Sequence, residues 1–338
     1  MKVLIITDAY APQVNGVVTT LQNTIQELRN RGYDVEVLEP SMFNGFPCPG
    51  YNEIQLSFAW PSLIKKHIKT INPDMIHIAT EGPIGLMARR VLRKLGMRWS
   101  SSFHTKFAEY VESRIGFGAN LVWKWLRWVY RDDRTILVTT PSMKDELVQH
   151  GFNESRLVVW GRGVNEKIFK PDNKYDDTGA HHGKPVWLNV GRVSVEKNLE
   201  AFYSMDLPGI KIQVGDGPAF ESLKQKYPDV QFVGPKKGDE LAHYYRMADV
   251  FVFPSKSDTF GLVMIESMRC GTPVAAYPVT GPIDVVENGL TGCLDDDLKK
   301  ACEAALLVPR ETVLENSTQF TWKNATDKFE CSLVFARN

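Results

Sequence analysis

Short apolar runs, rich in β-branched and aromatic residues, alternate with helical stretches along the whole of this sequence. Such runs are typical of buried parallel strands, and the helical stretches between them can cross over a sheet. We expect strands near residues 3–6, 35–38, 75–78, 99–103, 136–140, 186–190, 211–214, 230–233, 250–253 and 273–276. The alternation predicts an α/β fold of doubly wound parallel sheets.

The length of 338 residues exceeds that of a typical domain, and it allows two domains that each bury a core. Residues 171–185 are polar, rich in Gly and Pro and without periodicity, so they are expected to form a linker. We therefore expect one domain over residues 1–168 and another over residues 169–320. Because ligands bind beyond the carboxyl ends of strands in open α/β sheets, two such sheets would face a central cleft.

The charge is balanced overall but not along the chain. Residues 1–165 hold 20 Lys and Arg against 15 Asp and Glu, and residues 166–338 hold 20 against 25. The five cysteines form no CxxC pair, which argues for a reducing compartment and against structural zinc. The start, MKVLIITDAY, predicts a strand and not a signal peptide, and no apolar run approaches the roughly 18 residues of a membrane span. A cytoplasmic protein is expected.

The segment PSKSDTFGLVMIESMRCGTPVAA, residues 254–276, carries the strongest chemical signal. A turn with Asp258, Phe260 and Gly261 follows a strand, and a helix then begins at Leu262 and carries Glu266. The first amides of a helix have no intrahelical partner and suit an anion. Glu266 leans back toward the same helix end, since helical side chains tilt N-terminally. Two carboxylates beside a phosphate-binding helix end predict a ligand that joins a sugar to a phosphate.

A second signal, LNVGRVSVEKN at residues 188–198, follows another strand and supplies Arg192 and Lys197. One Arg guanidinium can bind two phosphate oxygens at once, whereas Lys acts as a point charge. The segment VGDGPAF places Gly215 in a tight turn, but Phe220 stands where a dinucleotide fingerprint needs its third glycine. A nicotinamide-dependent dehydrogenase is therefore the least favoured hypothesis for the function.

The 254–276 segment resembles the E-x7-E motif of family 4 glycosyltransferases, with Asp258 in place of the first Glu. The resemblance covers nearly the whole chain. It implies the GT-B fold of two Rossmann-like domains, with residues 321–338 as a helix that crosses back to the first domain. It also implies a retaining hexosyltransferase that uses a nucleotide diphosphate sugar, with a UDP-sugar favoured over GDP-mannose, and needs neither metal nor cofactor.

The resemblance further assigns roles to single residues. His104, Asp258, Arg192 and Lys197 are the expected catalytic residues. The expected donor contacts are Gly16, Arg192, Lys197, Gly215, Gly234, Asp258, Phe260, Gly261, Leu262 and Glu266. The candidate acceptor contacts are Asn15, Glu81, His104 and Arg162.

The basic first half suggests where the acceptor comes from. Arg89, Arg90, Arg93 and Lys94 cluster in one predicted helix, and Trp123, Trp125 and Trp128 alternate with cations in another. Such a surface suits an anionic membrane, although tryptophans in the core and solvated cations remain an alternative. The neutral pI and the lack of a recognition module argue against nucleic acid.

The segments HIATEGP, SDTFGLV and PVTGPIDVV resemble lipid glycosyltransferases, among them diacylglycerol glycosyltransferases and phosphatidylinositol mannosyltransferases. We therefore expect transfer of glucose, glucuronic acid or mannose to diacylglycerol or a glycolipid at the inner face of the cytoplasmic membrane. A soluble or polysaccharide acceptor, a nucleotide-sugar epimerase and a binding-only relative remain alternatives.

Overall fold

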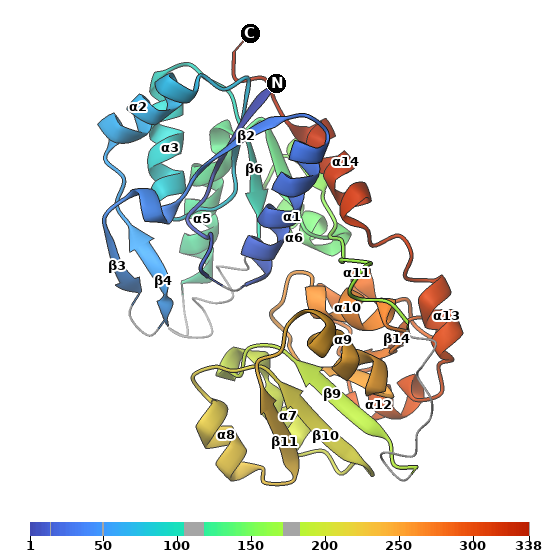
Figure 1. The fold of residues 1–338 in the computed structure, drawn as a ribbon. Helices are drawn as coiled ribbons and strands as arrows, with labels where there is room; N and C mark the ends of the chain where they lie inside the picture. Colours follow the sequence, from blue (N-terminus) through green and yellow to red (C-terminus); the bar gives the residue numbers. More distant parts are fainter. Residues whose placement is uncertain (14, 49–50, 105–117, 172–182, 338) are drawn as a thin grey trace. The chain divides into compact units, whose positions relative to one another are not determined.

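The computed structural model describes residues 1–13, 15–48, 51–104, 118–171 and 183–337. The chain divides into two compact units, residues 1–162 with 322–338 and residues 163–321. The expected α/β fold with two parallel sheets is confirmed, because each unit contains one six-stranded parallel sheet (Figure 1). Residues 172–182 of the expected linker lie outside the described residues.

The first unit is built on a sheet of order β2-β1-β5-β6-β7-β8, with a separate antiparallel pair β3-β4. Its strands are β1 (Lys2–Ile6), β2 (Asp34–Leu38), β3 (Gly45–Cys48), β4 (Tyr51–Ser57), β5 (Met75–Ile78), β6 (Ser100–Phe103), β7 (Thr135–Val138) and β8 (Leu157–Val159). Its helices are α1 (Gly16–Asn30), α2 (Pro61–Ile71), α3 (Pro83–Lys94), α5 (Ala119–Val129), α6 (Pro141–Gln149) and α14 (Trp322–Ser332), with short 3-10 turns η1 (Pro40–Met42), η2 (Tyr130–Asp132) and η3 (Glu154–Arg156).

Alternate residues of the central strands in this unit face opposite layers of helices, as the period of two in a strand requires. Ile76 and Ile78 of β5 pack in one core with residues of α2 and α3. His77, between them, lies against Phe329 of α14, with ring centroids 4.7 Å apart. Its two ring nitrogens lie 3.0 and 2.7 Å from the hydroxyls of Ser100 and Ser102. Burial lowers the pKa of His77 to about 3, so it is a neutral core histidine.

The last helix of the chain belongs to the first unit. Arg31 of the α1 C-terminus donates to Glu330 of α14 at 2.6 Å, and the Tyr33 hydroxyl donates to the same carboxylate at 2.7 Å. Beyond α14, the amide of Ala336 donates to the Asp74 carbonyl at 2.8 Å. Residues far apart in the sequence therefore complete one folding unit.

The second unit has the strand order β11-β10-β9-β12-β13-β14. Its strands are β9 (Val186–Val190), β10 (Ile210–Val214), β11 (Val230–Gly234), β12 (Val250–Phe253), β13 (Val274–Ala276) and β14 (Gly292–Leu294). Its helices are α7 (Leu199–Tyr203), α8 (Phe220–Lys226), α9 (Gly238–Met247), α10 (Leu262–Arg269), α11 (Pro282–Val285), α12 (Leu298–Ala305) and α13 (Arg310–Glu315), with the 3-10 turn η4 (Val195–Lys197).

The two faces of the second sheet again carry separate cores. Leu188 and Phe251 pack with Met264 of α10 on one face. Trp187 and Val250, one position away in each strand, pack with Phe202 of α7 on the other. The carboxyl ends of β9 and β12 therefore stay at one edge between two helical layers, and the loops from that edge hold most of the predicted site.

Candidate active site

The second unit has its topological switch point between β9 and β12, where successive connections leave in opposite directions. Ligands of open α/β sheets bind in the crevice at such a point. The loop after β9 carries Arg192 and Lys197, and the loop after β12 carries Asp258. The two loops are joined where the Asn198 amide donates to the Pro254 carbonyl at 3.1 Å. The structure thus places these three predicted residues in neighbouring loops.

Lys197 and Asp258 form an ion pair within this crevice. The Lys197 Nζ lies 2.6 Å from Asp258 Oδ1, and the two side chains are 27% and 24% exposed. The other carboxylate oxygen, Oδ2, is buried and has no hydrogen-bond partner among the described residues. Asp258 is therefore not the cap of the helix that follows it, and it retains an acceptor atom for a ligand.

Helix α10 presents its N-terminus at the same switch point. Gly261 occupies the N-cap position with φ of 82°, and as a glycine it has no side chain that could accept from the first amides of the helix. Phe260, the residue before it, is buried and anchors the turn in the core. The first amides of α10 are therefore oriented as an anion site, with Leu262 as the first helical residue.

Glu266 lies one turn into α10, where its carboxylate accepts a hydrogen bond from the buried Tyr245 hydroxyl of α9 at 2.9 Å. Burial raises the pKa of Glu266 to about 7, and the Tyr245 hydrogen bond acts in the opposite direction. The carboxylate is therefore fixed by a neighbouring helix, and it can be charged or neutral near pH 7.

Two glycines allow the loops of this edge to pack closely. Gly215, after β10, has φ of 128°, and a Cβ there would lie 1.9 Å from the Gly191 carbonyl oxygen in the loop after β9. Gly281, before α11, would place a Cβ 2.7 Å from the carbonyl oxygen of Asp258. Larger residues would push these loops apart. Gly234, the last residue of β11, ends a strand at the same edge.

In the first unit, the structure brings together two predicted residues that are 58 positions apart. Arg162 donates from Nη2 to Nδ1 of His104 at 2.9 Å. Its guanidinium also lies over the Trp160 ring, 4.5 Å from the centroid. Burial, followed by the charge of Arg162, lowers the pKa of His104 well below its ordinary value. His104 is therefore neutral, and because Nδ1 accepts from Arg162, Nε2 carries the proton.

Glu81 belongs to a buried network at the end of β5. Its carboxylate accepts a hydrogen bond from the Tyr130 hydroxyl, and burial raises the pKa of Glu81. Arg89 lies over the Tyr130 ring, 4.8 Å from the centroid, and pairs with Asp133 at 3.0 Å. Sequence reasoning missed Tyr130 and Asp133 as partners of Glu81 and Arg89.

Asn15 has a local structural role before α1. Its side-chain oxygen accepts hydrogen bonds from the amides of Val17 and Val18, at 3.1 and 3.0 Å. These amides begin the helix that starts with Gly16, one of the expected donor contacts. The helix end is therefore capped by its own chain in this structure.

Two of the predicted membrane contacts are wrong, because their side chains are buried within the first unit. Arg89 is 2% exposed and pairs with Asp133, and Trp123 is stacked on His150 with ring centroids 3.9 Å apart. A sequence signal existed, since Gly85, Ala88, Arg89 and Leu92 share the buried face of α3. Arg90, Arg93, Lys94 and Trp128 are exposed, and Trp125 is half-buried.

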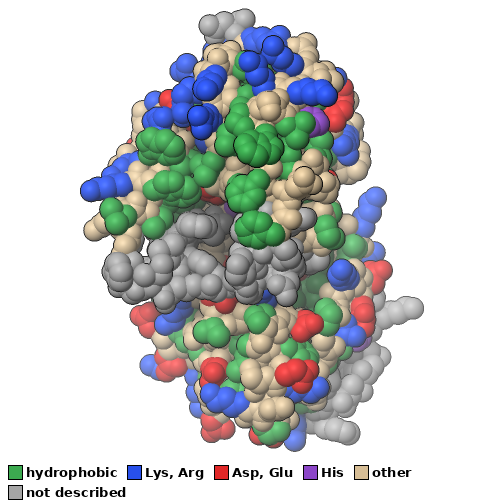
Figure 2. Space-filling view, turned by 90° about the vertical axis from the view of Figure 1, so that its left-hand side faces the viewer, with side chains coloured by type: hydrophobic (Ala, Val, Ile, Leu, Met, Phe, Trp, Pro, Cys, Tyr) green, Lys and Arg blue, Asp and Glu red, His purple; other side chains and the backbone are tan. Residues whose placement is uncertain are grey.

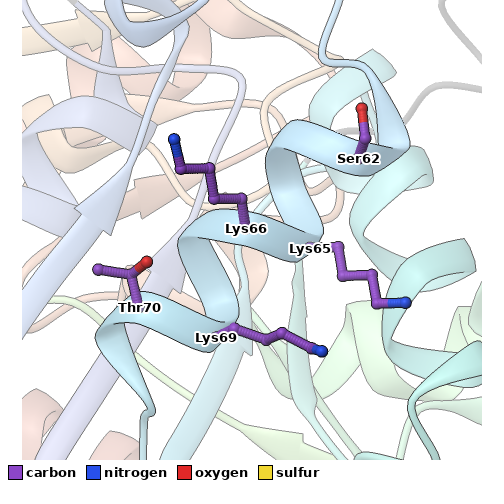
Figure 3. Close-up of a pocket in the computed structure, with 5 residues that line it drawn as sticks. All are labelled: Ser62, Lys65, Lys66, Lys69 and Thr70. Carbon is purple, nitrogen blue, oxygen red and sulfur yellow. The ribbon is translucent and has the colours of Figure 1, made fainter.

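A surface that sequence reasoning only partly identified lies on the side of α2 and α3. In Figure 3, Ser62, Lys65, Lys66, Lys69 and Thr70 line a shallow pocket on α2, with Lys65 and Lys69 extending to the same side. Exposed aromatic residues accompany them: Trp60 just before α2 is 76% exposed, and Phe58 and Phe46 are exposed with rings 5.6 Å apart. Figure 2 shows basic side chains gathered on this side, with apolar side chains next to them.

Within the ranges that the structure describes, no group of three or more His, Cys, Asp or Glu side chains is arranged to hold a metal ion. No helix in those ranges is long and apolar enough to cross a membrane.

Comparison with known proteins follows the division into two units. Residues 14–167 match the model described as Glycosyltransferase Family 4, and residues 184–308 match Glycosyl transferases group 1. Among curated proteins, the chain is 32% identical to sulfoquinovosyl transferase SQD2 of Arabidopsis thaliana, over 93% of this chain and 69% of that protein. It is 31% identical to a GDP-mannose-dependent alpha-mannosyltransferase of Mycolicibacterium smegmatis, over 88% and 84%. It is 24% identical to alpha-monoglucosyldiacylglycerol synthase of Streptococcus pneumoniae, over 91% and 78%.

Solved structures share the fold. Sucrose-phosphate synthase from Thermosynechococcus elongatus matches with a TM-score of 0.78 and 20% identity, over 98% of this chain and 97% of that one. Anabaena HepE in complex with UDP-glucose matches with a TM-score of 0.73 and 16% identity, over 98% and 99%. The resemblance seen in the sequence is thereby confirmed, and the chain belongs to the family 4 glycosyltransferases of the GT-B fold.

Proposed function

We propose that this glycosyltransferase moves a hexose from a nucleotide diphosphate sugar to a lipid acceptor, diacylglycerol or a glycolipid, with retention at the anomeric carbon. The observation that carries the donor half is the β9/β12 switch point, where Lys197 of the loop after β9, which also carries Arg192, pairs with Asp258 in the turn before the Gly261 N-cap of α10. A relative named alpha-monoglucosyldiacylglycerol synthase supports the lipid half.

In this proposal the second unit holds the donor. Arg192, Lys197 and the first amides of α10 bind the diphosphate and stabilise it as it leaves, so fixed cations do the work that a metal ion does elsewhere. Glu266, fixed by Tyr245, accepts hydrogen bonds from the ribose hydroxyls. The free oxygen of Asp258 accepts one from the sugar. The departing diphosphate takes the acceptor proton on the face from which it leaves, which gives retention.

The first unit contributes the acceptor side. His104, protonated on Nε2, is a neutral donor that can contact a developing oxyanion without adding a buried charge. Glu81, whose pKa is raised by burial, is a candidate to hold the acceptor by a hydrogen bond, while the diphosphate takes the proton.

We further propose a uridine diphosphate hexose, with glucose, glucuronic acid or mannose as the sugar, and no cofactor. The complex of a structural neighbour with UDP-glucose supports uridine, whereas the mannosyltransferase relative, by its name, uses GDP-mannose. A thermal-shift screen with UDP-glucose, UDP-glucuronic acid and GDP-mannose separates these donors. Stabilisation by GDP-mannose alone would overturn the choice of uridine.

The basic side of the first unit is the proposed membrane contact. Lys65 and Lys69 of α2 add charge, and Trp60 adds an indole that suits the interface between headgroups and acyl chains. Each basic residue near an anionic surface contributes about 1 kcal/mol. The protein would thus work as a peripheral enzyme at the inner face of the cytoplasmic membrane.

The test is a transfer assay with the preferred donor and with phosphatidylglycerol vesicles that contain diacylglycerol as the acceptor. We expect a glycosylated diacylglycerol, and a loss of at least about a hundredfold in Lys197→Ala, the order of effect seen when one transition-state donor is removed. Lys144→Ala, which removes a lysine paired with Glu154 in the first unit, is the matched control and should keep activity.

Two results would contradict the proposal in different ways. Absence of vesicle binding and of lipid product, with sugar transferred to a soluble acceptor, would remove the lipid half. Conversion of the donor sugar without any acceptor would identify an epimerase instead.

A further inference from the structure

The Lys197–Asp258 ion pair occupies the place that the proposed function gives to the donor diphosphate. Its 2.6 Å separation means that the Asp258 carboxylate neutralises the Lys197 ammonium. A diphosphate and Asp258 therefore compete for one cation. The two interactions with Lys197 are of similar strength, because both side chains of the ion pair are about one quarter exposed. Solvent therefore weakens the ion pair without abolishing it.

Hydrogen bonds join the two loops that carry the pair, so we expect the pair to open by side-chain rotation. Asn198, with φ of 53°, ties the first loop to the Pro254 carbonyl. The Ser257 hydroxyl makes a second link, to the Glu196 carbonyl at 3.4 Å. The chain at Gly281 also approaches the Asp258 backbone closely, since a Cβ on Gly281 would lie 2.7 Å from the Asp258 carbonyl oxygen. Lys197 has a long flexible stem, whereas Asp258 has one methylene, so the lysine is the side chain that moves.

The second oxygen of Asp258 indicates what a complete ligand must supply. Oδ2 is buried and accepts no hydrogen bond among the described residues. A buried acceptor without a donor is unfavourable, and a hydroxyl placed there would remove that cost. The sugar of a donor carries such hydroxyls, but a nucleoside diphosphate without its sugar does not.

We propose that Asp258 makes the site discriminate between the sugar nucleotide and the bare nucleoside diphosphate. This inference rests on the proposed function, that the site binds a nucleotide diphosphate sugar. When a sugar nucleotide binds, its phosphates pair with Lys197, and a sugar hydroxyl donates a hydrogen bond to Asp258. A bare diphosphate takes Lys197 and leaves the carboxylate unpaired beside its own negative charge. After transfer, Asp258 regains Lys197 and favours release of the product nucleotide.

The test is isothermal titration of the full chain with UDP and UDP-glucose, and with GDP and GDP-mannose, for the wild type and Asp258→Asn. The neutral amide no longer competes for Lys197 or repels phosphate. We therefore expect Asp258→Asn to bind the bare nucleotide about three- to tenfold more tightly, with no gain for the sugar nucleotide, the size expected when one partly exposed charge interaction is removed.

A double-mutant cycle separates competition for Lys197 from simple repulsion. In a Lys197→Gln background the gain from Asp258→Asn should shrink to less than about twofold, because there is no ammonium to release. Glu154→Gln removes the partner of Lys144 in the first unit and serves as the control. It should change neither affinity. Asp258→Ser provides a second neutral variant if Asp258→Asn does not keep the wild-type melting temperature.

The outcomes distinguish this inference from the function on which it rests. Unchanged or weaker binding of the bare nucleotide by both neutral variants, with wild-type melting, would overturn the inference alone. Failure of the wild type to bind any of the four nucleotides would overturn the proposed function and the inference together.

Discussion

The two sheets have equivalent topological switch points, but the side chains at these two points differ. Between β1 and β5 of the first unit, Asp8 accepts hydrogen bonds from the amides of Ile84 and Gly85 at the start of α3, at 2.7 and 3.1 Å. Between β9 and β12 of the second unit, the N-cap of α10 is Gly261, which has no side chain to accept from the first amides, and Asp258 in the preceding turn pairs with Lys197 instead. Topology supplies an anion site at both places. The side chains decide whether the protein fills the site itself or keeps it for a ligand.

The neighbouring ion pairs show the same contrast. Arg89, which donates to the Thr80 carbonyl beside Asp8, pairs with Asp133, and their side chains are 3% and 0% exposed. The Asp133 carboxylate also accepts from the Trp99 indole at 2.7 Å. The Lys197–Asp258 pair has fewer partners and more solvent. We interpret the first pair as structural and the second as functional.

The largest effect should come from breaking the buried pair. Arg89→Met leaves Asp133 buried without a countercharge, so the first unit should lose about 3–5 kcal/mol of unfolding free energy. Lys197→Met, at the partly exposed pair, should cost no more than about 1 kcal/mol. Urea unfolding of both variants measures the difference. Equal losses would contradict the contrast between the pairs.

Removing the two switch-point carboxylates tests the contrast directly. Asp8→Ala leaves two backbone amides at the start of α3 without an acceptor, and we expect a loss of about 2–4 kcal/mol. Asp258→Ala should remain within about 1 kcal/mol of the wild type, as for a partly exposed pair, and should lose sugar transfer. Thermal unfolding and the transfer assay measure the two effects. An Asp8→Ala variant as stable as the wild type would show that the start of α3 does not need the Asp8 carboxylate.

Glu266 gives a pH-dependent comparison, because burial raises its pKa to about 7 from the ordinary 4.5. The folded protein holds this proton more tightly than the unfolded chain, so the stability of the second unit falls as pH rises from about 4.5 to about 7. Glu266→Gln cannot ionise, and it should be more stable than the wild type by about 3 kcal/mol at pH 8 and equal to it at pH 4. The same difference at both pH values would exclude this explanation.

The smallest effect concerns the capped helix of the first unit. Asn15→Ala removes the acceptor for the amides of Val17 and Val18, and it should cost about 1 kcal/mol. Asn15→Gly should cost only a few tenths of a kcal/mol, since glycine suits the N-cap position. Circular dichroism melts of the two variants measure this difference. Equal melting temperatures for both variants would mean that the cap contributes little.

Much of the fold could be predicted because its signals are local. The strands at Met75–Ile78, Val186–Val190 and Val250–Phe253 have the predicted boundaries, since an apolar β-branched run bounded by polar turns defines a buried parallel strand. The β3-β4 hairpin and the short strands β8 and β14 were not predicted. Pro47 lies within β3, and a three-residue strand such as Gly292–Leu294 has too little periodicity to be recognised.

The candidate site was predicted only as a set of residue types. The sequence determined the strand–turn–helix order, the glycine turns, and the presence of Arg192, Lys197, Asp258 and Glu266, because these depend on neighbours in the chain. Tertiary structure decided that Lys197 contacts Asp258, 61 positions away, that Tyr245 fixes Glu266, and that Arg89 is buried. Such contacts depend on which strands become neighbours in the sheet, and strand order is set by packing of the whole unit.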